Sequence, residues 1–258
     1  MSDSSTYLQA VTDVARLAGD IANQHYRKQV SVETKIDGTP VTIADRSAEE
    51  AARKWIEQRF PDDGILGEEF PTVREGARRT WIVDPIDGTK TFIRDVPLWG
   101  SLVAVIEDRR VIAGAAFFPA VSETISAAVD CGCWWNDSHA HVSSIDELAN
   151  ATILTSASPF SADDSITKRW RDLEAATLVS RTWGDCFGYL MVATGRAEVM
   201  ADPVLSLWDI AAFLPIISEA GGVLTDFSGI ETAFGGNAIA TNRALSESAR
   251  KILIHGTN

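Results

Sequence analysis

The order of the apolar segments constrains the fold of this chain most strongly, because the pattern changes near Ser143. Before that point, two segments with helical spacing of apolar residues (8–22 and 48–56) are followed by short β-like runs with no helix between them. After it, short strands alternate with helical segments up to a last helix over residues 246–254. Consecutive strands predict a largely antiparallel sheet, whereas alternation predicts an α/β arrangement. We therefore expect a mixed α/β (α+β) fold.

The length of 258 residues suits one compact unit with two lobes. We expect an N-terminal α+β lobe over residues 1–142 and a C-terminal α/β lobe over residues 143–258. An extended hairpin over residues 34–43 should turn at Asp37-Gly38. In the second lobe, a helix over residues 207–220 should be kinked by Pro215.

The formal net charge of −13 is spread along the chain. Such a field repels nucleic acid and anionic membranes, so we expect neither as a partner. It also repels an anionic substrate unless cations are bound locally.

The cysteine count is odd, and Cys131 and Cys133 are too close in sequence to pair easily. A reduced cytoplasmic setting fits this usage best. The first residues lack the basic and apolar regions of a signal peptide, and no apolar run reaches membrane-spanning length.

Two acids, Asp84 and Asp87, come directly after an apolar strand. The stretch W-I-V-D-P-I-D-G-T occupies residues 81–89, and Pro85 should end the strand pairing. Buried carboxylates without a counter-charge are costly, and a hard divalent cation with oxygen ligands supplies one. The carbonyl of Ile86 could be a further ligand. Taken alone, the stretch could equally be a turn in which aspartate is a local cap.

Two more acidic clusters lie at the ends of apolar elements, and they favour a hard-metal site. Glu68 and Glu69 follow one such run, although an exposed strand end is an alternative interpretation. Asp209 lies in the first turn of a predicted helix, where its negative charge could instead interact favourably with the helix dipole. Free N–H groups of Gly88 and Thr89, at the start of a short helix, suit a phosphate beside the metals. Cations held by acids would then offset the charge of an anionic substrate.

Other catalytic motifs are absent from the sequence. We find no H-E-x-x-H, C-x-x-C or G-x-S-x-G pattern. His139 and His141 could bind a metal, but their polar surroundings favour a solvated turn.

These motifs resemble the inositol monophosphatase superfamily of lithium-sensitive, magnesium-dependent phosphatases. The matching segments are G-E-E at 67–69, D-P-I-D-G-T at 84–89, W-D-x9-E-A-G-G at 208–222, and Lys35 with V-T-I-A-D at 41–45. The resemblance covers nearly the whole chain. It implies a layered αβαβα sandwich of the inositol monophosphatase/sugar phosphatase type, often a homodimer.

The resemblance also implies two or three Mg²⁺ ions held by particular residues. Glu68, Asp84 and the Ile86 carbonyl would hold one ion, and Asp84, Asp87 and Asp209 the second. Glu68 would also help to hold a weaker third ion.

The remaining roles that the resemblance implies concern water and phosphate. Thr89, oriented by Asp45, would position or deprotonate the attacking water, and Glu68 is the third residue expected to be catalytic. Backbone N–H groups of Gly88 and Thr89 would bind phosphate. The reaction implied is direct in-line hydrolysis without a phosphoenzyme.

Several stretches most resemble the histidinol-phosphate phosphatase branch, among them 89–99, W-G-D at 183–185 and A-D-P at 201–203. Asp185 and Asp202 could pair with the ammonium and imidazole groups of histidinol. Asp185 could instead cap a helix over residues 188–194, and Asp202 could stand in a plain turn.

We therefore expect hydrolysis of histidinol phosphate to histidinol and phosphate, as in histidine biosynthesis. The alternatives are an inositol-1-monophosphatase or a nucleotide 3′,5′-bisphosphate phosphatase. A more distant alternative is a non-catalytic regulatory binding protein.

Overall fold

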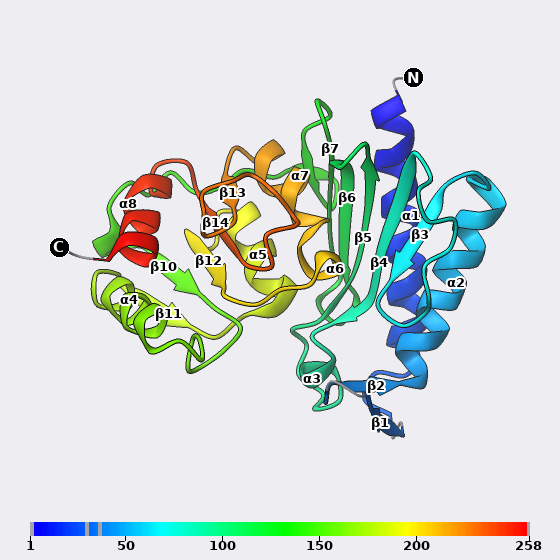
Figure 1. Ribbon diagram of the computed structural model, residues 1–258, viewed down its shortest axis with the longest axis horizontal. Helices are drawn as coiled ribbons and strands as arrows, with labels where there is room; N and C mark the ends of the chain where they lie inside the picture. The colour runs from blue at the N-terminus through cyan, green and yellow to red at the C-terminus, as the bar shows by residue number, and fades with distance from the viewer. Residues whose placement is uncertain (1–2, 29–30, 36–37, 257–258) are drawn as a thin grey trace.

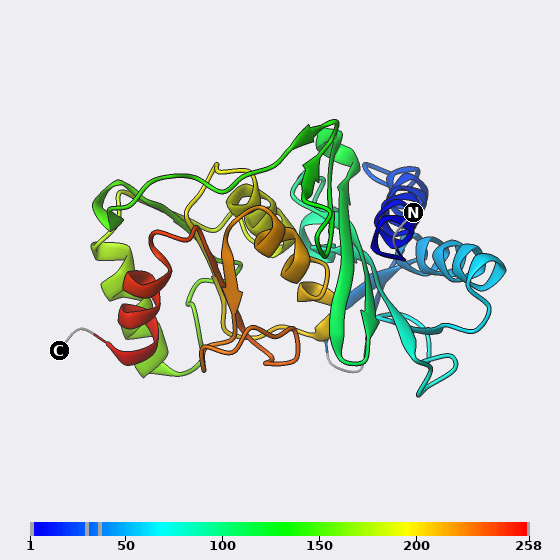
Figure 2. The same cartoon turned by 90° about the horizontal axis from the view of Figure 1, so that it is seen from above.

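The computed structural model describes residues 3–28, 31–35 and 38–256. Two sheets alternate with three layers of helices (Figure 1). Helices α1 (Asp3–Asn23) and α2 (Ile43–Arg59) form one outer layer, and α4 (Asp164–Ala175) and α8 (Ser246–Arg250) form the other. The view from above in Figure 2 shows the same order of layers. The predicted αβαβα sandwich is confirmed.

The seven-stranded sheet has the strand order β3-β4-β5-β6-β7-β8-β9 and packs against α1 and α2. Only β3 and β4 run parallel; all other neighbours are antiparallel, as predicted. Its strands are β3 (Gly64–Gly67), β4 (Arg79–Asp87), β5 (Gly100–Glu107), β6 (Arg110–Phe118), β7 (Glu123–Ala128), β8 (Cys133–Trp135) and β9 (Ser138–His139).

The five-stranded sheet has the order β11-β10-β12-β14-β13 and mixes parallel with antiparallel pairs. Its strands are β10 (Thr152–Leu154), β11 (Val179–Arg181), β12 (Val199–Asp202), β13 (Val223–Thr225) and β14 (Ala238–Thr241). Between the sheets lie α5 (Asp185–Ala193), α6 (Leu207–Ile210) and α7 (Phe213–Glu219). One apolar cluster joins both sheets through this middle layer. The lobe boundary between residues 142 and 143 stays a prediction.

Shorter elements complete the described chain. A two-stranded ribbon of β1 (Val32–Thr34) and β2 (Pro40–Thr42) confirms the hairpin, although Asp37 of its predicted turn lies outside the described residues. The others are α3 (Thr89–Phe92), two 3-10 turns (Pro119–Val121 and Leu148–Asn150) and a π-helical end (Lys251–His255). None of the helices described has the length and apolar character needed to cross a bilayer.

The segment 207–220 forms two helices that break at Ala211 and Ala212. The break lies four residues before Pro215, which has no N–H to donate to the Ala211 carbonyl, so the predicted disturbance by Pro215 takes the form of a complete break. The prediction that Pro85 ends the strand pairing was wrong. Strand β4 continues past Pro85, because its pairing with β5 shifts register between Asp84 and Asp87. This irregularity accommodates a residue that cannot donate to the ladder.

The break between α6 and α7 packs directly on the seven-stranded sheet at Gly114 of β6. A Cβ atom added at Gly114 would lie 2.2 Å from the carbonyl oxygen of Ala212. Because that neighbour is backbone, it cannot move away without shifting the helix. The absence of a side chain at Gly114 therefore sets how closely α6 and α7 approach the sheet.

We expect Gly114→Ala to lower the free energy of unfolding by about 1–3 kcal/mol, because the extra methyl overpacks this contact. Urea denaturation measures the change. Glu50→Ala, on the exposed face of α2, is the control and should stay within about 0.5 kcal/mol of the parent. Equal stability of the two variants would contradict the prediction.

Candidate active site

A cavity of about 210 Å³ lies where the end of β4 meets α3, α6 and the start of α5. It is lined by Thr39, Pro40, Glu68, Asp84, Ile86, Asp87, Gly88, Thr89, Lys90, Asp185 and Asp209. Every predicted metal ligand is among them. Larger hollows of about 490 and 640 Å³ lie elsewhere, but they lack this convergence of acids.

Three carboxylates form the centre of the cavity. Asp84 and Asp87 lie on the irregular end of β4, and Asp209 comes from α6 in the middle layer. One oxygen from each lies within 4.8 Å of the others, and among the described residues this is the only such group of three or more potential ligands. Asp209 is far from Asp84 and Asp87 in sequence, so the complete site exists only in the folded chain.

The electrostatics of these acids require a counter-charge. Burial and then neighbouring acids raise the pKa of Asp84 and Asp87 well above the ordinary value. Burial, together with the charge of Glu68, raises the pKa of Asp209 to about 7, although the N–H of Ser206 donates to its carboxylate at 2.7 Å. Oxygen ligands of this kind suit a hard divalent cation. The residues present therefore fit Mg²⁺.

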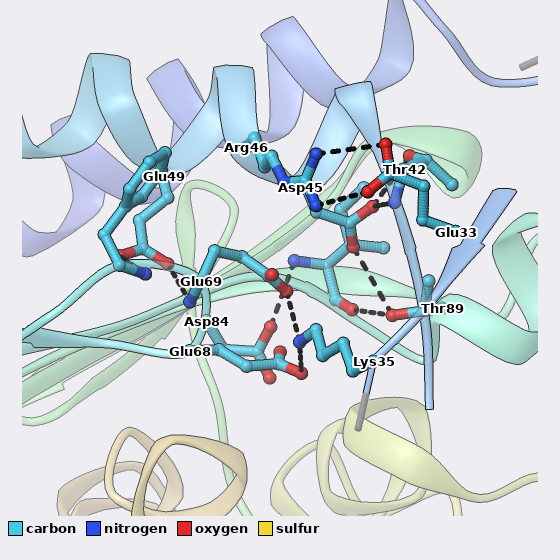
Figure 3. Close-up of polar contacts among 12 residues, drawn as sticks. Glu33, Lys35, Thr42, Asp45, Arg46, Glu49, Glu68, Glu69, Asp84 and Thr89 are labelled. Carbon is cyan, nitrogen blue, oxygen red and sulfur yellow. Dashed lines mark hydrogen bonds and ion pairs between the residues drawn. The ribbon is translucent and has the colours of Figure 1, made fainter. Parts of the chain in front are cut away.

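Glu68 lies beside this group and already has a cationic partner. The Nζ atom of Lys35 lies 2.7 Å from Oε1 of Glu68 and 2.7 Å from Oε1 of Glu69 (Figure 3). Burial lowers the pKa of Lys35, but its hydrogen bonds to both glutamates outweigh that effect and raise it. The backbone N–H of Glu68 donates to the carbonyl of Val83, which places the residue next to Asp84.

Thr89 and Asp45 meet at one side of the cavity. The Thr89 hydroxyl donates to the Ile86 carbonyl at 3.0 Å and lies 3.5 Å from Oδ1 of Asp45 (Figure 3). The other Asp45 oxygen accepts hydrogen bonds from the N–H and hydroxyl of Thr42 at 2.8 and 2.7 Å. Asp45 is fully buried, and this burial raises its pKa.

Gly88 opens α3 in a left-handed conformation, with φ of +85°. This conformation favours glycine. An added Cβ would also lie 2.9 Å from the Thr91 hydroxyl and 3.3 Å from Oδ2 of Asp185. The glycine therefore leaves the start of α3 open toward the cavity.

Asp185 is the first residue of α5, and its side chain does not cap the helix. The cap interpretation is therefore wrong. Its backbone is left-handed, with φ of +49°, and its N–H donates to the Ser156 hydroxyl at 2.7 Å. Its carboxylate lies 3.5 Å from the Thr91 hydroxyl, and burial raises its pKa. A strained residue held by its surroundings is common at functional sites.

Asp202 ends β12 instead of standing in an exposed turn, and only 2 % of it is accessible. Its two oxygens accept hydrogen bonds from the Ser156 N–H at 2.9 Å and the Tyr189 hydroxyl at 3.1 Å. Burial raises its pKa to about 6. It does not line the metal cavity but an adjoining one of about 110 Å³, which shares Asp87, Asp185 and Asp209 with it.

Sequence reasoning missed several residues around the site. Tyr189 could have been found, because it follows Asp185 by one turn of α5, but Ser156 gives no signal in the sequence. Cys186 is buried, and its N–H donates to Asp87. All three cysteines are free thiols. His139 packs against Trp134 with the rings tilted and their centroids 3.9 Å apart, outside the acidic group.

Comparison with known proteins agrees with this geometry. The model of the inositol monophosphatase family matches residues 3–255. A histidinol-phosphatase of Chlorobaculum parvum is 39% identical, over 92% of this chain and 93% of its own length. A histidinol-phosphatase of Mycobacterium tuberculosis is 39% identical, over 84% and 85% of the two chains.

Solved structures show the same likeness. The extragenic suppressor protein suhB of Bartonella henselae superimposes with a TM-score of 0.91 at 27% identity, covering 98% of this chain and 100% of that one. An inositol monophosphatase of Zymomonas mobilis gives 0.87 at 30% identity, covering 98% and 99%. With its acidic cavity and these relatives, the chain belongs to the inositol monophosphatase family and is a phosphatase.

Proposed function

We propose that this phosphatase is Mg²⁺-dependent and hydrolyses histidinol phosphate to histidinol and phosphate, the reaction used in histidine biosynthesis. The observation that carries the proposal is the convergence of Asp84, Asp87 and Asp209 in one cavity with Glu68 and Thr89 beside them. The similarity to histidinol-phosphatases at 37–39% identity supports the choice of substrate. A non-catalytic binding protein has no need of so complete a set of acids.

The proposal assigns two or three Mg²⁺ ions to these acids. Glu68, Asp84 and the Ile86 carbonyl would hold one ion, Asp84, Asp87 and Asp209 the second, and Glu68 would help with a third. Bound Mg²⁺ would lower the pKa of water and offset the negative charge of the reacting phosphate. The raised pKa values of Asp84, Asp87 and Asp209 support this assignment, because a bound cation would favour the ionised forms that burial and mutual repulsion disfavour.

The chain's own groups would then orient water and phosphate. The Thr89 hydroxyl lies against Asp45 and the Ile86 carbonyl, so it is fixed beside the acids where an attacking water would be positioned. Backbone N–H groups of Gly88 and Thr89 at the start of α3 would hold phosphate oxygens. Hydrolysis is in line and needs neither a cysteine nor a histidine nucleophile.

The leaving group would be recognised by Asp185 with Asp202 behind it. Asp185 lines both cavities, whereas both oxygens of Asp202 already accept hydrogen bonds. Asp185 is therefore the better placed of the two to pair with the ammonium of histidinol. Asp202 would pair with the imidazole only by giving up one of its present hydrogen bonds. Inositol offers only neutral hydroxyls, so a half-buried acid beside a buried one favours a cationic substrate.

The proposal also includes a cytoplasmic homodimer that is inhibited by lithium. These features rest on the family resemblance and on the three free cysteines, which suit a reducing compartment. Gel filtration with light scattering tests the dimer.

A substrate panel tests the function directly. With Mg²⁺, we expect phosphate release from histidinol phosphate to be faster than from inositol 1-phosphate or a nucleotide 3′,5′-bisphosphate, and EDTA to abolish it. Loss of a group that only supports a metal ligand lowers activity roughly 10–100-fold, so loss of the ligand itself in Asp209→Asn should lower activity by more than that. The same result would exclude a contaminating phosphatase. Preference for inositol 1-phosphate would select the alternative substrate, and full activity in EDTA would contradict metal dependence.

Substitution of Asp185 tests how the leaving group is recognised. We expect Asp185→Ala to raise KM for histidinol phosphate about 10-fold or more, because a charge-assisted hydrogen bond contributes about 1.5–3 kcal/mol. KM for p-nitrophenyl phosphate should change much less. Asp185→Asn separates charge from shape. Equal effects on both substrates would show that Asp185 only supports the fold.

The raised pKa values also predict how pH affects the metal-free protein. Asp202 has a pKa of about 6 and Asp209 of about 7, above the ordinary value of about 3.9 expected in the unfolded chain. The folded state therefore binds more protons, and these groups stabilise it fully only below about pH 4, an effect lost as pH rises through 6 to 7. In EDTA, Tm should fall as the pH rises from 5.5 to 8. Addition of Mg²⁺ should raise Tm more at pH 8 than at pH 5.5.

Thermal unfolding followed by circular dichroism measures this dependence. Asp209→Asn is the control, since removal of one titrating acid should flatten the decline. If the Tm of the metal-free protein rose from pH 5.5 to 8, these acids would not dominate the pH dependence of its stability.

A further inference from the structure

A charged stripe runs along the buried face of α2, where apolar residues are usual. Asp45, Glu49 and Arg53 follow one another at four-residue spacing, so they lie on one face of the helix. Asp45 and Glu49 are fully buried and Arg53 is 9 % exposed. Asp45 contacts Thr89, but the function described so far uses neither Glu49 nor Arg53.

Glu49 binds the backbone of the segment that follows β3. Its Oε2 accepts the N–H of Glu69 at 2.7 Å (Figure 3). Its Oε1 accepts the N–H of Phe70 at 3.3 Å and Nε of Arg53 at 2.7 Å. The carboxylate thus has partners on both oxygens, as a buried charge requires.

Arg53 binds the same segment through its carbonyl groups. Its guanidinium donates to the carbonyls of Phe70 at 2.9 Å and Pro71 at 3.1 Å. Its Cζ atom also lies over the Phe70 ring, 5.7 Å from the ring centre. The ion pair therefore holds both donors and acceptors of the backbone over residues 69–71.

Gly67 lets the carboxylate approach so closely. A Cβ atom added there would lie 2.0 Å from Oε1 of Glu49. Gly67 itself pairs with Val83 in the sheet, and the N–H of Glu68 donates to Val83. The backbone on both sides of Glu68 is thus held: Gly67 pairs with β4, and the N–H of Glu69 binds Glu49. The Glu68 side chain lies beside Asp84.

We propose that Glu49 is a positioning residue for Glu68. Together with Arg53 it fixes the backbone of residues 68–71, so that the Glu68 carboxylate faces Asp84 and its affinity for a divalent cation is set. A buried ion pair stabilises a fold little compared with apolar side chains of the same size, whereas groups behind metal ligands orient them strongly. The inference rests on the proposed role of Glu68 as a metal ligand.

Mn²⁺ binding by isothermal titration calorimetry tests this without any substrate. Glu49→Gln keeps the shape of the side chain but loses its charge, and we expect its weakest Mn²⁺ site to lose about 10-fold or more in affinity. Glu57→Gln is the matched control on the same helix. Glu57 pairs with Arg74 at the surface, at 3.6 Å and with 47% of its side chain exposed, so its substitution should leave the affinity unchanged.

Kinetics give a second readout. In Glu49→Gln, the Mg²⁺ concentration for half-maximal activity should rise by about the same 10-fold factor, and kcat at saturating Mg²⁺ should return close to that of the parent. If the role of Glu49 were purely structural, its substitution would lower Tm and leave the metal dependence of the folded protein unchanged.

The outcomes separate this inference from the proposed function. If the parent protein binds no Mn²⁺, the proposed function fails. If the parent binds and folded Glu49→Gln binds equally well, only the role of Glu49 is overturned. Should Glu49→Gln not fold, Arg53→Lys decides, because it keeps the charge but loses the fork that holds two carbonyls. Arg53→Lys should also weaken Mn²⁺ binding relative to the parent. Unchanged Mn²⁺ affinity in this variant would overturn the inference.

Discussion

The mutual repulsion of carboxylates gathered in one cavity is the constraint on which the rest of this structure depends. Asp84, Asp87 and Asp209 each place an oxygen within 4.8 Å of the others, with Asp84 buried and the other two half-buried. Like charges so close together are stable only beside a cation or when protonated. The raised pKa values express this cost, and the ammonium of Lys35 on Glu68 and Glu69 relieves part of it nearby.

The surrounding fold supplies rigid points from which these acids project. The register shift in β4 turns two aspartates toward one cavity, and the short helix α6 brings a third from the middle layer. Gly114 lets α6 and α7 lie close to the sheet. Around this centre, α2 contacts Thr89 through Asp45 and the Glu68 segment through Glu49.

Much of this arrangement could be predicted from the sequence, because its signals are local. Asp84 and Asp87 end an apolar run, and the hairpins and five-layer fold follow from the order of strands and helices together with the family motifs. The position of the break at Ala211 follows from Pro215, which cannot donate to the Ala211 carbonyl. The close approach of the break to the sheet was not predictable, since it depends on packing against Gly114. The buried stripe was not predicted because charged residues on a helix usually face water, so the sequence gives no reason to bury Glu49 and Arg53.

The origin of Asp209 has a consequence for the protein as a whole. Two of the central acids come from the seven-stranded sheet, and the third follows the central strand of the other sheet. An ion that they share would cross-link distant parts of the polypeptide, so its binding energy would add to the cohesion between the sheets. A fragment that ends before β10 would keep the D-P-I-D-G-T motif and could form its strand, yet it would lack the chemistry, because no complete cage exists in either half.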